Sequence, residues 1–171
     1  MATLDEASIK RVLPHSIEAE QSVIGAMMID NEVINVASEL VRGEDFYNKQ
    51  YGIVFESMVE LFESGKPVDT VTLQNKLKEK DVPSEVSSLE FIMGIITAVP
   101  TSANIRYYAN IVAEKSILRN MIRLNEEIEN LCYSGKESME FILEDAEKRI
   151  FASSGFVSSR RSAIISKSRS S

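Results

Sequence analysis

The residues that could carry chemistry are few and lie far apart along the 171 positions of the chain. The one histidine, His15, and the one cysteine, Cys132, show no paired spacing typical of a zinc site. The Gly-Lys steps at Gly65 and Gly135 lack both the upstream glycine and the following Ser or Thr of a phosphate-binding loop. We therefore predict no catalytic residue, no metal and no cofactor for this chain, and an enzyme is the least favoured class.

Glu18 and Glu20 are the residues that most resemble a catalytic pair of carboxylates. Both follow Ser16, a residue that favours the N-cap of a helix, and carboxylates in a first helical turn are stabilised by the helix dipole. We interpret the pair as helix-start charges. By similar reasoning, we expect His15 to be a surface or capping residue and Cys132 to be a small packing residue.

The elements that dominate the pattern are two long helices over residues 101–152, which reverse at Ser134-Gly135-Lys136. Each carries an apolar stripe with helical spacing: Ile117, Met121, Leu124, Ile128 and Leu131 in the first, and Met139, Ile142, Leu143, Ala146 and Ile150 in the second. A further set lies about 100° round the first helix: Ile111, Leu118 and Ile122. Because a hairpin needs one stripe per helix, this set predicts contact with the preceding domain or with another chain.

Helical periodicity also prevails before residue 100, and no segment shows the two-residue alternation of a strand. The predicted fold class is all-α, with a compact multi-helix head followed by a long antiparallel helical hairpin. The expected divisions are a flexible leader (1–13), the head (14–100), the hairpin (101–152) and a Ser-rich basic linker or disordered tail (153–171). Within the head, Asp69 is expected to cap a helix, Ser87 and Glu90 to form a capping box, and the aromatic pair 46–47 to tuck into the core.

Charge is unevenly distributed along the chain. Residues 1–152 hold 15 basic and 26 acidic residues, a net of −11, whereas residues 153–171 hold four basic residues and no acid. An acidic body binds DNA poorly but attracts a protein partner with a basic surface. No run of about 18 apolar residues predicts a membrane span, the first residues lack a secretion signal, and a lone cysteine suits the cytoplasm.

Several stretches resemble bacterial replicative DNA helicases of the DnaB family. The opening of that family resembles Leu13–Gly25, which reads LPHSIEAEQSVIG. Further matches follow in order at Glu44–Tyr47, Gly65–Leu73, Val99–Ala109 and Glu114–Arg119. Together these matches extend the resemblance over residues 13 to about 152.

The resemblance implies a non-catalytic role in DNA replication. In the family this region is the amino-terminal collar of a hexameric ring, in which hairpins pair to make a trimer of dimers. The collar also docks the carboxy-terminal domain of primase, and a helicase loader is a possible further partner. ATP and Mg²⁺ belong to a RecA-like motor domain that these 171 residues do not contain. The family linker continues into a docking helix, whose apolar pattern is not seen in residues 153–171.

The residues expected at interfaces follow from this resemblance and from the hairpin stripes. For primase docking they are Glu18, Phe91, Ile122 and Ile128, and for the oligomer they are Ile111, Leu118 and Ile122. Ile128 also belongs to the stripe assigned to the partner helix, so those two assignments compete. Ile122→Asp is expected to abolish association while helix content is kept. Two alternatives stay open: a generic all-α dimerisation adaptor, and the helicase-binding domain of a primase.

Overall fold

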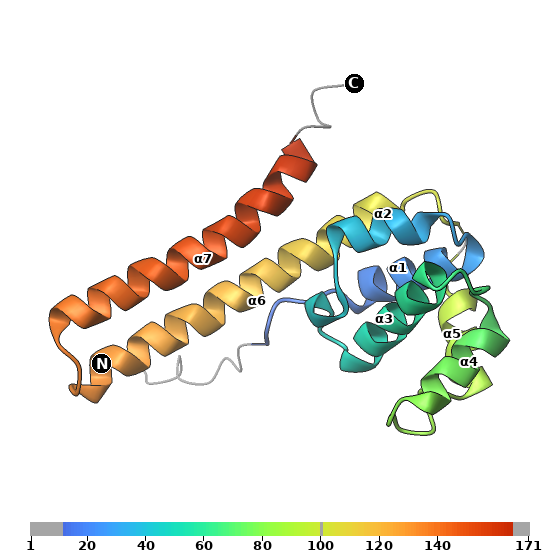
Figure 1. Ribbon diagram of the computed structural model, residues 1–171, viewed down its shortest axis with the longest axis horizontal. Helices are drawn as coiled ribbons and strands as arrows, with labels where there is room; N and C mark the ends of the chain where they lie inside the picture. Colours follow the sequence, from blue (N-terminus) through green and yellow to red (C-terminus); the bar gives the residue numbers. More distant parts are fainter. Residues whose placement is uncertain (1–11, 100, 166–171) are drawn as a thin grey trace, which may run out of the picture.

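The computed structural model describes residues 12–99 and 101–165, and the regular elements among these residues are all helices, with no strand (Figure 1). The predicted all-α class is confirmed. The elements are α1 (Ile17–Ile29), α2 (Val33–Leu40), a short 3₁₀ helix η1 (Gly43–Asp45), α3 (Lys49–Glu63), α4 (Thr70–Glu79), α5 (Leu89–Thr97), α6 (Ile105–Ser134) and α7 (Met139–Ile165).

Local capping explains where the short helices of the head begin. Asp69 caps α4 as expected, because its carboxylate accepts hydrogen bonds from the backbone amides of Val71 at 2.9 Å and Thr72 at 2.8 Å. The Thr72 hydroxyl in turn lies 3.0 Å from the Asp69 amide, so the two residues form a reciprocal capping box.

The capping box expected at Ser87 and Glu90 is wrong by one residue. Ser88 is the N-cap of α5, and its hydroxyl accepts the Phe91 amide at 3.1 Å. Ser87 is buried instead and donates to the Ser84 carbonyl oxygen at 3.2 Å. Adjacent serines offer the same capping chemistry, so the sequence alone could not choose between them.

The core of the head surrounds α1, which contacts α2, α3, α5 and α6. Its residues Val23, Ile24 and Met27 are at most 1% exposed, and Phe55 and Met58 of α3 are equally buried. A helix that is apolar on most sides requires cover from several neighbours, and the short helices supply it.

The helix α6 joins the head to the hairpin without interruption. Its first half places Ile105, Ala109 and Val112 in the head core, and its second half leaves the head to lie along α7 (Figure 1). The reversal occurs where it was predicted, since Gly135 follows α6 with φ of +58°, a left-handed conformation that glycine adopts without strain.

The end of the hairpin differs from the expectation. Helix α7 continues to Ile165, so residues 153–165 are helical and the linker predicted to start at residue 153 does not start there. Serine is tolerated in helices, and this stretch contains no proline and only one glycine, Gly155. Residues 166–171 of the predicted tail and residues 1–11 of the predicted leader lie outside the described residues.

Candidate interaction surfaces

A buried polar cluster fastens α6 to the head. Arg119 is only 3% exposed, and its guanidinium donates hydrogen bonds to the backbone carbonyl oxygens of Pro14, at 2.8 Å, and Asp45. One turn earlier on α6, Ser116 donates to the Asp45 carboxylate at 2.7 Å. Burial lowers the pKa of Arg119, and the nearby Glu20 carboxylate opposes that shift. The cluster therefore ties three segments that are far apart in sequence.

Glu20 belongs to the same junction, and its interpretation as only a helix-start charge is wrong. The residue does lie in the first turn of α1, but it is 1% exposed. Its carboxylate accepts the backbone amides of Tyr47 at 2.7 Å and Asn48 at 3.0 Å. Asn48 is itself the side-chain cap of α3, so Glu20 sets the position of the segment that starts this helix.

Aromatic contacts complete the junction. The ring of His15 stacks on Tyr47 with centroids 4.2 Å apart, and the Arg119 guanidinium lies 5.8 Å from the Tyr47 centroid. Phe46 is 5% exposed and packs against Phe55, as predicted for this aromatic pair. Tyr47, the other member of the pair, is 41% exposed. His15 therefore takes part in packing more than a surface residue would.

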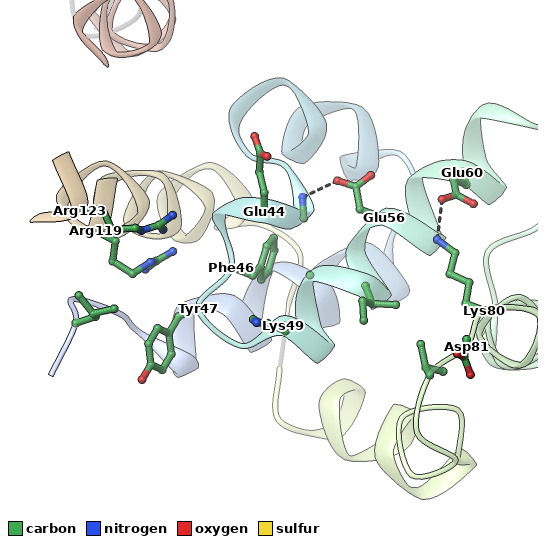
Figure 2. Close-up of a pocket in the computed structure, with 15 residues that line it drawn as sticks. Glu44, Phe46, Tyr47, Lys49, Glu56, Glu60, Lys80, Asp81, Arg119 and Arg123 are labelled. Atoms are coloured by element: carbon green, nitrogen blue, oxygen red, sulfur yellow. Dashed lines mark hydrogen bonds and ion pairs between the residues drawn. The ribbon is translucent and has the colours of Figure 1, made fainter. Parts of the chain in front are cut away.

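A groove of about 900 Å³ opens beside this junction (Figure 2). Arg119 and Arg123 of α6 lie at one end of it, and Lys80 and Asp81 lie at the other. Apolar side chains contribute to the lining, and they are Leu13, Phe46, Tyr47, Ile53 and Val82. Charges of both signs border the groove, so they indicate no single class of ligand. Among the described residues, no group of three His, Cys, Asp or Glu side chains could hold a metal ion.

The seam between α6 and α7 is partly polar. Arg149 of α7 pairs with Asp145 on the same helix and with Glu127 of α6, and Asp145 is half-buried. The apolar contribution of α7 to this seam comes from Ile142 and Ala146, which are half-buried. The long side chain of Arg149 lies at this seam, where the predicted stripe placed only apolar residues.

The predicted hairpin stripes are therefore wrong in part. On α6, Leu124 is 7% exposed, whereas Met121 is 39% exposed. On α7, three of the five stripe residues are exposed to solvent: Met139, Leu143 and Ile150. We define the outer apolar face as five exposed apolar residues of these two helices, which the helical period of about 100° per residue places on one side of the hairpin: Leu118, Met121, Met139, Leu143 and Ile150.

The residues predicted for primase docking fall into two groups. On the head, Glu18 is exposed in the first turn of α1, and Phe91 of α5 is half-buried with its ring 6.0 Å from that of Tyr51. On the hairpin, Ile122 and Ile128 of α6 are half-buried. Their role at an interface stays a prediction.

The residues predicted for the oligomer differ in exposure. Ile111 packs against the core of the head, so this part of the second stripe is covered within the chain. Leu118 is 47% exposed, and Ile122 is half-buried. Cys132, expected to be a packing residue, is exposed instead.

The polar junction was missed by sequence reasoning, although a signal for it was present. Arg119 follows Ile105 and Val112 at intervals of seven residues, which places all three on one face of α6. That face enters the head core. A charged residue on such a face requires buried hydrogen-bond partners, so the position of Arg119 in the sequence indicated a polar contact with the head.

No described helix combines the length and apolarity needed to cross a bilayer.

Comparisons with known proteins agree with this architecture. Residues 12–114 match the family described as the DnaB-like helicase N-terminal domain. Replicative DNA helicase DnaC of Bacillus subtilis (strain 168) is 40% identical over 140 residues, which are 82% of this chain and 31% of that protein. Replicative DNA helicase DnaB of Geobacillus stearothermophilus is 36% identical over 147 residues, which are 86% of this chain and 32% of that protein. The chain thus spans about a third of the length of these relatives.

Solved structures give the same result. The crystal structure of the N-terminal domain of DnaB helicase from Mycobacterium tuberculosis aligns with a TM-score of 0.78 and 30% identity, covering 83% of this chain and 99% of that one. The N-terminal domain of DnaB helicase from Helicobacter pylori, described together with its interactions with primase, aligns with a TM-score of 0.60 and 25% identity, covering 68% and 90%. This chain belongs to the DnaB-like helicase N-terminal domain family.

Proposed function

We propose that this chain forms part of the amino-terminal collar of a hexameric replicative DNA helicase, where its hairpin holds subunits together. The outer apolar face carries this proposal. Leu118 of α6 and Leu143 of α7 are 47% and 56% exposed, and leaving such side chains in water forgoes about 25 cal/mol for each Å² that a partner would cover. An assembly that covers this face gains that free energy.

The second part of the proposal is docking of the carboxy-terminal domain of primase. Its support is the Helicobacter pylori relative, whose solved structure is described with its interactions with primase. The net charge of −11 over residues 1–152 would attract a basic partner surface. Glu18 and Phe91 on the head, with Ile122 and Ile128 on the hairpin, are the residues we propose for this contact.

A whole helicase would bind ATP and Mg²⁺ in a motor domain, contact a helicase loader and act on DNA in the cytoplasm. The role proposed for residues 12–165 within it is binding and scaffolding.

Light scattering after size exclusion tests both parts. The chain is loaded at several concentrations, alone and with the carboxy-terminal domain of primase. We expect a mass that rises with concentration and a heavier mixed species with primase. Self-association without a mixed species would overturn docking by this domain and favour a dimerisation adaptor. A strict monomer that binds nothing would overturn both parts.

Variants separate the two surfaces. Leu118→Asp places a charge in the outer apolar face and is expected to abolish self-association, because a desolvated charge without a partner opposes burial. Ile122→Asp is expected to act in the same direction. Val71→Asp on α4 of the head is the matched control, since Val71 is 65% exposed and far along the chain from the hairpin. Loss of association in the control but not in Leu118→Asp would contradict the assignment.

The docking surface is probed on the head. Glu18→Lys reverses an exposed charge in the first turn of α1. We expect it to weaken primase binding and leave self-association unchanged. Equal primase binding by this variant and the native chain would remove Glu18 from the proposed contact.

A further inference from the structure

The groove beside the junction has two kinds of charged side chain in its lining. Some are engaged within the chain: Arg119 binds two carbonyl oxygens, and Glu60 pairs with Lys80. Glu56 accepts the backbone amide of Gly43 at 2.6 Å. The other charged side chains are exposed and form no hydrogen bond or ion pair within the described part of the chain: Glu44, Lys49, Asp81 and Arg123. These four groups are available to a second molecule.

The four available charges are spread along the groove instead of being gathered at one point. Arg123 of α6 lies at one end, and Asp81, which follows α4, lies at the other (Figure 2). Glu44 of η1 and Lys49 of α3 lie between these ends. Apolar side chains contribute to the lining as well. The groove therefore offers a cation at one end, an anion at the other and apolar surface along its length.

Part of the lining is backbone that is held in close contact. Gly43 and Gly52 both line the groove, and a Cβ atom at Gly52 would collide with the Gly43 carbonyl oxygen. No side chain therefore separates η1 from α3 here, and the hydrogen bond from Gly43 to Glu56 fixes the same contact. A groove with a fixed shape loses little conformational freedom when a ligand binds, which favours affinity.

The size and the charges of the groove favour a peptide over other ligands. Its volume of about 900 Å³ lies near the upper end of the roughly 300–1,000 Å³ typical of ligand sites. Nucleic acid is disfavoured, because the carboxylates of Glu44 and Asp81 would repel phosphate groups. A peptide can carry an acidic, a basic and several apolar side chains on one short segment, and so it can match all parts of the lining.

We propose that this groove binds a short peptide segment of another protein, with an acidic side chain against Arg123, apolar side chains along the middle and a basic side chain against Asp81. The reverse direction of the segment would place like charges together at both ends. Because Arg123 lies on α6 and Asp81 on the head, the bound segment would bridge the two.

This surface differs from those of the proposed function. Among the described residues, the lining includes none of those assigned above to primase docking or to self-association: Glu18, Phe91, Ile111, Leu118, Ile122 and Ile128. The inference therefore goes beyond the proposed function and does not depend on it. Failure of peptide binding would leave the proposed self-association and primase docking unaffected.

The experiment uses the full chain and a display library of short random peptides, because the sequence of the natural segment is not known. We expect the selected peptides to share an acidic and a basic residue separated by apolar residues. One selected peptide is then labelled with a fluorophore, and its affinity for the chain is measured by fluorescence anisotropy. A library that yields no binder, or binders without this pattern, would overturn the inference.

Charge reversal at the α6 end tests whether the selected peptide lies in the groove. Arg123→Glu should weaken its binding by about tenfold, and a peptide whose acidic residue is replaced by lysine should recover the loss. Arg106→Glu makes the same change at an exposed position of the same helix outside the groove and is the matched control. Both variants are first compared with the native chain in thermal unfolding. Equal binding by the native chain and the folded Arg123→Glu variant would contradict the inference.

The other end of the groove tests the direction of the segment. Asp81→Lys should weaken binding of the same peptide, and replacing the basic residue of the peptide by glutamate should restore it. Glu39→Lys reverses an exposed carboxylate on α2 outside the groove and should leave binding unchanged. Recovery in Asp81→Lys through a change at the acidic residue of the peptide would reverse the proposed direction.

Two further probes distinguish other occupants of the groove. Labelled single-stranded oligothymidine is expected not to bind, and binding that Arg123→Glu abolishes would assign the groove to nucleic acid and contradict the inference. The carboxy-terminal domain of primase is expected not to displace the peptide. Displacement would make the groove part of the primase contact and contradict a separate site.

Discussion

Two regions along α6 differ in whether their contacts are made within the chain. One is the junction with the head, and the other is the outer side of the hairpin. At the junction, Arg119, Ser116 and Asp45 are buried, and each has a hydrogen-bond partner within the chain. Beyond it, Leu118 and Met121 lie on the same helix and face solvent. The first region is complete within one molecule, whereas the second exposes apolar area that a partner would cover.

Burial together with polarity distinguishes residues that make contacts within the chain from residues available to a partner better than hydrophobicity alone does. The charged Arg119 holds the chain together, whereas the apolar Leu143 lies at the surface. Substitutions in the two regions should therefore change different observables: the free energy of unfolding in one case and self-association in the other.

The largest expected effect is that of Arg119→Met. Removing the guanidinium deletes its hydrogen bonds to the carbonyl oxygens of Pro14 and Asp45 and the positive charge that faces the carboxylates of Glu20 and Asp45. We expect a loss of about 3 kcal/mol in the free energy of unfolding, measured by urea denaturation at a concentration where the chain is monomeric. Arg123→Met, at an exposed position in the same groove, is the control and should cost less than about 0.5 kcal/mol. Equal losses in both would show that the buried contacts do not matter.

Glu20→Gln is expected to cost about 1–3 kcal/mol. The amide keeps the shape of the side chain but offers one oxygen where the carboxylate accepts two backbone amides. Glu18→Gln changes an exposed carboxylate in the same turn and should leave thermal unfolding nearly unchanged. The interpretation fails if Glu18→Gln is the more destabilising of the two.

Neighbouring residues on α7 sharpen the contrast further. Ile142→Ala removes a half-buried contact with α6 and should lower stability by about 1–2 kcal/mol. Leu143→Ala should change stability by less than about 0.5 kcal/mol and weaken self-association by about tenfold. Chemical denaturation and sedimentation equilibrium measure the two effects. If Leu143→Ala unfolds the hairpin as readily as Ile142→Ala, the two sides of α7 are not distinct.

The smallest expected effect lies in a half-buried ion-pair cluster on the surface of the head. Hydrogen bonds from Lys80 and then Lys76 lower the pKa of Glu60, so its contribution is present above the ordinary pKa of a glutamate and is lost as pH falls through the lowered value. Glu60→Gln should cost less than about 1 kcal/mol at pH 7, and the difference should shrink toward pH 3. A difference in melting temperature that grows on acidification would reverse this assignment.

Sequence patterns predicted the helices well because their signals are local. The cap at Asp69, the reversal at Gly135 and the long periodic run of α6 each depend on residues a few positions apart. The end of α7 was misplaced because a drop in apolar periodicity does not by itself break a helix.

The junction could not be derived in the same way because its partners lie far apart. Arg119 bonds to Pro14, 105 positions earlier, and to Asp45, 74 positions earlier. Helical spacing indicates that Arg119 faces the head, but it does not identify the carbonyl oxygens that accept its hydrogen bonds. The exposure of the outer apolar face could likewise not be derived from the sequence. An apolar stripe has the same residue pattern whether it packs against its own chain or against another.

The unbroken course of α6 has a mechanical consequence. Its 30 residues make a rod about 45 Å long, with one half embedded in the head and the other outside it. A rod held in this way is a lever: a tilt of about 5° at the head would move the end of the roughly 22 Å outside the head by about 2 Å. Small adjustments of the head would thus be magnified at the tip, and the stiffness of the polar junction would determine how faithfully displacement is transmitted.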